Sequence, residues 1–273
     1  MERNPNLRIC YDRIVPAGLS LVSPVLHKMR EDALLRATGA ATPRKAFHDL
    51  DPRGIIPAPH MAIITAKSWP AGSHLKCRFL EGSPTQQAKV IHKAKLWEEY
   101  ANITIDFVTT PDEQVRIAFQ SGQGSWSAVG QDVLNDKYFP ATAPTMNYGW
   151  LADDTDDTEY ERVVVHEFGH ALGCIHEHQS PGEQLKWNVE AVYAQFSGPP
   201  NNWDKETIDS NILQKYSADG INATIFDRHS IMLYQFPAEL FLDRVATPLN
   251  TSLSKKDKSF IAQVYPHSTV PVT

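Results

Sequence analysis

The segment HEFGHALGCIHE, residues 166–177, decides how this chain is interpreted. Residues four apart lie on one face of a helix, so the imidazoles of His166 and His170 project from the same side and can reach one metal ion. Gly173 follows shortly after, and a glycine there can take the left-handed conformation that ends the helix and turns the chain. The turn brings His176 back toward the same point. The spacing therefore predicts three imidazole ligands around one ion.

Zinc suits this set of ligands, because it binds imidazole nitrogen at about 2.0 to 2.1 Å in a tetrahedral shell. Three protein ligands leave one position open for water, as in catalytic sites, and zinc lowers the pKa of that water to about 7. Glu167 cannot easily reach the same ion, but its carboxylate can take a proton from this water and pass it to a leaving amine. A chance match to H-E-x-x-H-x-x-G-x-x-H has odds on the order of 10⁻⁴. We therefore predict one catalytic zinc ion per chain.

The helix that carries this motif is expected over Thr158–Gly173, because Thr158 and Glu161 form an S/T-x-x-E capping box. Aspartates crowd its start, at positions 153, 154, 156 and 157. A calcium loop is one interpretation of this cluster, but the glycine and the closing glutamate of an EF-hand are missing. We prefer a solvated cluster that is compatible with the helix dipole.

Shorter elements are expected on both sides of this helix. Apolar runs between turn residues predict strands over Leu75–Leu80, Ile103–Val108, Val115–Phe119 and Thr145–Tyr148. Helical spacing predicts helices over Thr85–Ala101, Val189–Phe196, Glu206–Tyr216 and Ser254–Tyr265. Ser254 and Asp257 form a capping box at the start of the last helix.

Prolines set the first part of the chain apart from the rest. Seven of them fall within residues 1–60 and leave one plausible short helix, around Leu26–Ala37. We therefore expect an N-terminal extension over residues 1–60, a single domain over residues 61–267 and a short C-terminal tail over residues 268–273.

Composition disfavours several classes of function. Lys and Arg number 26 against 32 Asp and Glu, a formal charge of −6, and no long basic cluster is present, which disfavours nucleic-acid binding. No window approaches the roughly 18 consecutive apolar residues of a membrane-spanning helix, so no membrane anchor is expected. The hydrophobic share of 42% and the charged share of 21% are those of an ordinary globular chain.

The sequence leaves localisation and disulfide status open. Residues 14–26 are the one candidate for a signal peptide, but their apolar run is interrupted and no A-x-A-like cleavage site follows. Secretion by a non-classical route and an intracellular location both stay open. The cysteines Cys10, Cys77 and Cys174 allow at most one bridge, so this is no disulfide scaffold.

Two motifs resemble those of a known family. Residues 166–177 resemble the signature of astacin-type zinc peptidases, within the metzincins, and the run SIMLY of residues 230–234 resembles their methionine turn. The resemblance implies that Met232 packs beneath the histidines and that Tyr234 binds the metal or the oxyanion according to state. It also implies that Glu177 makes a buried polar contact instead of ligating the metal.

The resemblance extends more weakly over Trp69–Pro266 and implies an α+β, metzincin-like, two-lobed fold. The upper lobe would hold a mixed twisted sheet and two long helices, and an irregular helical lower lobe would contain the methionine turn. Ser125, Trp126 and Ser127 fall where such enzymes have the edge strand that pairs with an extended substrate. A core role for Trp126 is an equal alternative.

The sequence thus predicts a zinc endopeptidase acting on a protein or peptide, with Glu167 as the general base and Tyr234 helping to hold the developing oxyanion. One alternative is a zinc-dependent amidase or deacetylase, which would use the same metal chemistry to hydrolyse a non-peptide amide. Another is a non-catalytic module that binds a partner through the cleft, and the intact Glu167 argues against it. Subsite preference and oligomeric state stay open.

The role of the extension also has alternatives. Pro-segments of the resembled family block the zinc with an aspartate in an F-x-G-D-like motif. Phe47-His48-Asp49 and Asp51 match this motif only weakly. Cys10 is a second candidate, as a blocking thiolate. An arm that stabilises the fold is slightly preferred over an inhibitory one.

Overall fold

The computed structural model describes residues 9–13, 63–199, 201–216, 221–222 and 226–267. The strands are β1 (Tyr11–Arg13), β2 (Ile63–Ile64), β3 (Ser73–Phe79), β4 (Ile103–Phe107), β5 (Val115–Ala118), β6 (Ser125–Ala128), β7 (Met146–Tyr148) and β8 (Ile221–Asn222). The α-helices are α3 (Pro84–Ala94), α4 (Asp157–Ala171), α5 (Val189–Phe196), α6 (Lys205–Ile208) and α7 (Lys255–Val264). Single turns are η1 (Thr65–Lys67), η2 (Lys95–Trp97), η3 (Gly130–Leu134), η4 (Glu177–Gln179), the π-turn η5 (Asp209–Leu213) and η6 (Ala238–Leu240).

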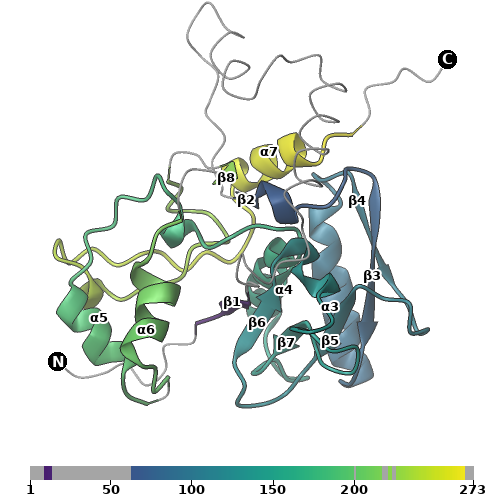
Figure 1. Cartoon of the computed structure of the whole chain (residues 1–273), viewed down its shortest axis with the longest axis horizontal. Coiled ribbons are helices and arrows are strands. Elements are labelled where there is room, and N and C mark those ends of the chain that lie inside the picture. The colour runs from purple at the N-terminus through teal and green to yellow at the C-terminus, as the bar shows by residue number, and fades with distance from the viewer. Residues whose placement is uncertain (1–8, 14–62, 200, 217–220, 223–225, 268–273) are drawn as a thin grey trace, which may run out of the picture.

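A mixed six-stranded sheet forms one side of the molecule, in the order β1-β6-β7-β5-β3-β4. The strands β4, β3, β5 and β7 run parallel, β6 is antiparallel to β7, and β1 runs parallel to β6. The helices α3 and α4 pack against each other beside this sheet (Figure 1). Their apolar faces meet the sheet in a core that includes Val90, Ile105, Ile117 and Phe168, all fully buried. We call this part the sheet lobe.

The rest of the described chain is less regular. The short helices α5 and α6 lie on the other side of the molecule from the sheet, and α7 lies near the top of the view (Figure 1). Met232 lies in a segment without helix or strand, between β8 and η6. We call the described residues between 177 and 253 the second lobe. The prediction of an α+β fold with a mixed sheet is confirmed.

The start of α4 differs from its prediction. Asp156, not Thr158, is the N-cap, and its side chain accepts a hydrogen bond from the Glu159 amide at 2.9 Å. The predicted box of Thr158 and Glu161 is therefore wrong. An aspartate caps a helix at least as well as a threonine, and the earlier start brings Glu159 into the first turn, where it pairs with Arg162 through two bonds of 2.7 Å.

Two other helices are shorter than expected. The segment predicted as Thr85–Ala101 ends as an α-helix at Ala94, continues as η2, and begins with a capping box of Ser83 and Gln86. The segment predicted as Glu206–Tyr216 is α6 followed by a π-turn. The capping box of Ser254 and Asp257 on α7 is confirmed.

The N-terminal strand β1 was not predicted at all, and neither was the two-stranded pair of β2 and β8. The helix expected around Leu26–Ala37 and the motif Phe47-His48-Asp49 lie outside the described residues. All three cysteines, Cys10, Cys77 and Cys174, are buried, and none of them forms a disulfide bond. Within the described residues, every helix is too short or too polar to cross a membrane.

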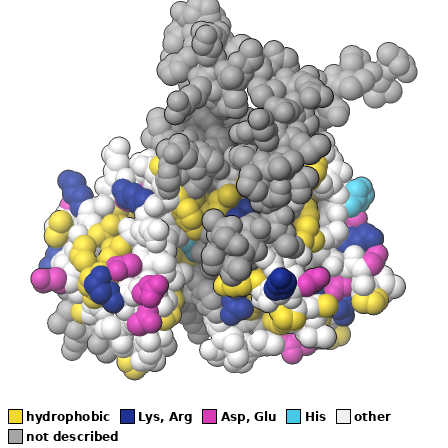
Figure 2. Space-filling view, in the orientation of Figure 1, with side chains coloured by type: hydrophobic (Ala, Val, Ile, Leu, Met, Phe, Trp, Pro, Cys, Tyr) yellow, Lys and Arg dark blue, Asp and Glu magenta, His cyan; other side chains and the backbone are white. Residues whose placement is uncertain are grey.

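Charged side chains of both signs are interspersed over the visible described surface, on both lobes (Figure 2). At the start of α4, Asp156 is the N-cap, and Asp157, the first residue of the helix, pairs with Lys93 at 2.5 Å. These roles agree with the solvated interpretation of the cluster.

Candidate metal centre

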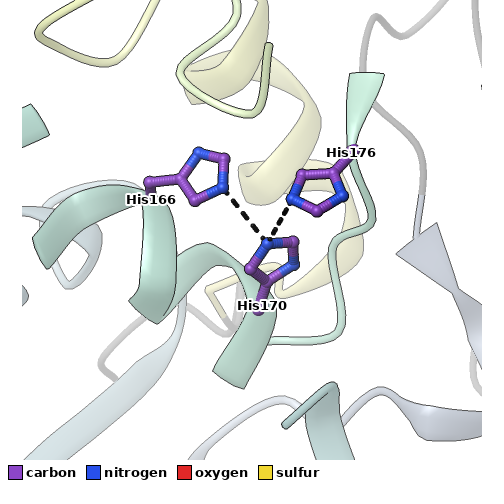
Figure 3. A group of neighbouring side chains, drawn as sticks. All are labelled: His166, His170 and His176. Atoms are coloured by element: carbon purple, nitrogen blue, oxygen red, sulfur yellow. Dashed lines mark hydrogen bonds between the residues drawn. The ribbon is translucent and has the colours of Figure 1, made fainter. Parts of the chain in front are cut away.

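Three histidine side chains converge where the two lobes meet. His166 and His170 come from the last turns of α4, and His176 from the segment that follows (Figure 3). The Nε2 atom of His170 lies 3.2 Å from that of His166 and 3.0 Å from that of His176. All three side chains are buried, with at most 2% of their surface exposed. The structure therefore brings the predicted ligands to one point.

The outer ring nitrogen of each histidine faces an acceptor. The Nδ1 atoms of His166 and His170 lie 2.8 Å from the carbonyl oxygens of Ile231 and Cys174, respectively. A carbonyl oxygen can only accept, so Nδ1 donates and Nε2 keeps its lone pair. Nitrogen lone pairs that converge at this distance repel unless a cation lies between them.

Zinc fits this arrangement. Bonds of about 2.0 to 2.1 Å in a tetrahedral shell place ligand nitrogens about 3.3 Å apart, close to the observed separations. Burial lowers the pKa of all three imidazoles, that of His170 to about 4, so the rings are neutral near pH 7 and ready to bind a metal. A group of three buried imidazoles is also the ligand type that zinc prefers.

The turn between the second and third histidines is held from outside α4. Gly173 has φ of +98°, the left-handed conformation that its position predicted. Trp69 donates from Nε1 to the carbonyl of Ala171 at 2.8 Å, and the Tyr265 hydroxyl donates to that of Leu172 at 2.5 Å. These donors satisfy carbonyls that the end of a helix leaves without an intrahelical partner. Neither donor was predictable from the sequence, because both lie far along the chain from the carbonyl that they reach.

Met232 is fully buried and packs against α4 at Gly169. A Cβ atom at Gly169 would collide with the Met232 sulfur, so the glycine allows the methionine segment to approach the helix between the two histidines. The backbone of this segment also joins the site, because the Met232 carbonyl accepts a hydrogen bond from the Glu177 amide at 3.0 Å.

Tyr234 and Glu177 lie beside the cluster in different ways. The Tyr234 ring is 4.3 Å from the ring of His176. Its hydroxyl donates to the Cys10 carbonyl and also lies within hydrogen-bonding distance of Nε2 of His176. Glu177 is fully buried, and its Oε1 accepts the Asp227 amide proton at 2.7 Å. Burial raises the pKa of Glu177. Glu177 thus has the buried polar contact that the resemblance implied.

Glu167 is fully buried and lies against the N-terminal segment. Ligand atoms of Cys10, His166 and Glu167 all lie within 4.8 Å of one another. Burial and the charge of Glu167 raise the pKa of the Cys10 thiol. The structure therefore places Cys10, a residue far from the motif in sequence, directly beside the histidine cluster.

The segment after Cys10 covers the predicted substrate strand. β1 pairs with β6, so that Tyr11, Asp12 and Arg13 lie opposite Trp126, Ser127 and Ala128. The Arg13 guanidinium stacks over the Trp126 ring at 3.7 Å. Ser125, Trp126 and Ser127 are all buried in this arrangement.

Known proteins resemble this chain over most of its length. The family model for matrixins matches residues 68–183. A structure of myroilysin is 40% identical with a TM-score of 0.73, over 76% of this chain and 99% of that one. A second myroilysin structure is 37% identical with a TM-score of 0.59, over 84% and 98%. High choriolytic enzyme 1, a hatching enzyme zinc-protease from the medaka fish Oryzias latipes, is 17% identical with a TM-score of 0.49, over 74% and 95%. No curated protein sequence matches.

Proposed function

Because the chain belongs to the metzincin zinc peptidases and is a zinc-dependent endopeptidase, we propose specific roles for the residues of its metal centre. The family and the activity are those predicted from residues 166–177. We assign zinc binding to His166, His170 and His176, supported by their convergent Nε2 atoms. Zinc bound there supplies Lewis acidity, toward a water molecule and toward the carbonyl group of a peptide.

Glu167 is the general base in this proposal. Its carboxylate takes a proton from the attacking water and delivers it to the nitrogen of the leaving amine, so the proton count balances over the reaction. Its burial beside His166 supports this role, because a desolvated carboxylate within reach of the ligands is well placed to exchange a proton there. Met232 and Gly173 shape the site without contacting the substrate.

The substrate is a protein or peptide, and we propose that its extended backbone pairs with β6. The supporting observation is that β6 already pairs there with a segment of this chain, β1. Backbone pairing along a strand selects a polypeptide over a small amide, which disfavours the amidase alternative. Incubating the metal-loaded protein with a diverse peptide pool and sequencing the products tests this directly, since an amidase would leave internal peptide bonds intact.

Replacing Tyr234 with phenylalanine should lower kcat by about 10² to 10³-fold, because loss of one oxyanion donor typically has that effect. KM should change little, and zinc content should not change, because only a hydroxyl that acts late in the reaction is removed. Steady-state kinetics and metal analysis check both expectations, with Tyr234→Phe compared in a chain that also carries Cys10→Ala and Arg13→Ala, because the Tyr234 hydroxyl contacts the Cys10 carbonyl. Activity within a factor of two of wild type would remove Tyr234 from the mechanism.

We further propose that the N-terminal extension keeps the enzyme latent. β1 pairs with the edge of β6 where we propose that the substrate binds. Cys10 fills the space beside His166 and Glu167 that a substrate needs. The Tyr234 hydroxyl is also engaged, through the Cys10 carbonyl. An inhibitory arm is therefore better supported than the purely structural arm that the sequence slightly favoured.

Combining Cys10→Ala with Arg13→Ala in the full chain should raise peptide hydrolysis at least about tenfold, because losing these contacts shifts the population toward chains with an open cleft. The double variant removes the thiol beside Glu167 and the cation over the Trp126 ring. Initial rates on a quenched fluorescent peptide measure the effect. Cys77→Ala, at another fully buried free cysteine, is the matched control and should stay latent. Unchanged activity together with a lower melting temperature would support the structural arm instead.

A further inference from the structure

Gln179 stands out among the residues around the metal centre because its side chain faces a ligand. It is the last residue of η4 and is buried, with 2% of its surface exposed. Its Oε1 lies 3.3 Å from Nδ1 of His176. The corresponding Nδ1 atoms of His166 and His170 use backbone carbonyls, which no substitution removes. His176 is thus a ligand whose outer contact depends on a side chain.

The other end of the amide fixes its orientation. Nε2 of Gln179 donates to the carbonyl of Ser210 at 2.7 Å and to that of Gln214 at 3.2 Å. A flipped amide would point its oxygen at two carbonyl oxygens, which only accept, so Oε1 must face His176. An acceptor at Nδ1 requires the proton there and leaves Nε2 with its lone pair.

These bonds connect the ligand to the second lobe. Ser210 belongs to η5, Gln214 follows that turn, and the Tyr216 amide donates to the Gln179 carbonyl at 3.0 Å. His176 follows the left-handed turn at Gly173, so it is not held by the regular hydrogen bonds of α4 that support His166 and His170. Its ring orientation therefore needs support from elsewhere.

We propose that Gln179 is a positioning residue that fixes the tautomer and the ring orientation of His176 through Oε1, using the η5 segment as its anchor. This inference rests on the proposed assignment of His176 as a zinc ligand. Partners that orient a ligand in this way typically account for about 10 to 100-fold of metal affinity.

Two variants of matched length separate the acceptor from the anchor. Gln179→Met loses the acceptor and both donor bonds. Gln179→Glu loses the amide donors, but in either protonation state a carboxyl oxygen still accepts from Nδ1 of His176. If Oε1 is what matters, zinc affinity of the full chain should fall about 10 to 100-fold in the methionine variant and stay close to wild type in the glutamate variant.

Competition with a chromophoric chelator measures affinity, and ring ¹⁵N spectra of histidine-labelled protein report which nitrogen of His176 carries the proton. Gln86→Met is the control, since the Gln86 amide makes a similar pair of bonds, to Ser83 and Leu151, within the sheet lobe. It should leave zinc affinity unchanged.

Wild-type affinity in Gln179→Met would overturn the inference and leave the proposed function intact. Equal losses in both Gln179 variants would also overturn it, because the anchor rather than the acceptor would then matter. Wild-type spectra with the proton of His176 on Nε2 would overturn it without any variant. A wild-type chain that takes up no zinc would instead overturn the proposed function.

Discussion

Glu167→Gln should leave zinc bound and the fold intact while lowering peptide hydrolysis by about 10² to 10⁴-fold. The amide keeps the size and most of the hydrogen-bonding shape of the carboxylate but lacks its basicity. A base that also delivers the proton to the leaving amine should give a loss at the upper end of that range. The rate is best compared in the background of Cys10→Ala and Arg13→Ala, where the cleft is open, with metal analysis in parallel.

The same variant separates enzyme from binding module. A peptidase should lose cleavage and retain uncleaved substrate, whereas a module that only binds would hold its partner equally well with either residue. Glu177→Gln is a useful comparison, because Glu177 is an equally buried carboxylate whose Oε1 already accepts the Asp227 amide. Its effect should be on stability more than on kcat. Undiminished cleavage by the zinc-loaded Glu167→Gln variant would mean that another group is the base.

The histidine site was predictable because its parts are close in sequence. Helical periodicity alone puts His166 and His170 on one face, and a glycine with positive φ is the local device that ends the helix before His176. The same holds for the box of Ser254 and Asp257, in which both residues lie within one turn. Where a few consecutive residues determine the local geometry, their types are enough to predict it from the sequence.

The start of α4 shows where local rules are not enough. Asp156 and Thr158 each have a glutamate three residues later, so two overlapping caps compete for the same helix. Contacts outside the local sequence favour the earlier start: Asp157 reaches Lys93 on α3. A choice between two acceptable caps is decided by packing, which the pattern does not contain.

Contacts between distant segments escaped prediction for a related reason. β1 is three residues long, and its residues show no strand-like alternation. Its partner β6 lies far from it in the sequence, at Ser125–Ala128. Gln179 looks like any polar residue in a turn until η5 supplies carbonyls for its amide. In both cases the function depends on a partner that sequence spacing cannot identify.

His170→Ala should abolish stoichiometric zinc binding by the chain. His170 is the central one of the three proposed ligands, since its Nε2 lies within 3.2 Å of the Nε2 atoms of both other histidines. Removing it leaves two of the three imidazoles, and a zinc site held by only two protein ligands is weak. Metal analysis after dialysis should give one zinc per wild-type chain and none per variant chain.

Zinc should also stabilise the wild-type fold, because an ion that binds only the native state at a thousand times its Kd adds about 4 kcal/mol. Chelation should therefore lower the melting temperature of the wild-type chain and leave that of His170→Ala unchanged. His92→Ala, at an exposed histidine on α3, is the control and should respond to chelation as wild type does. Zinc retained in full by His170→Ala would show that the metal is held elsewhere, and the three-histidine assignment would then be wrong.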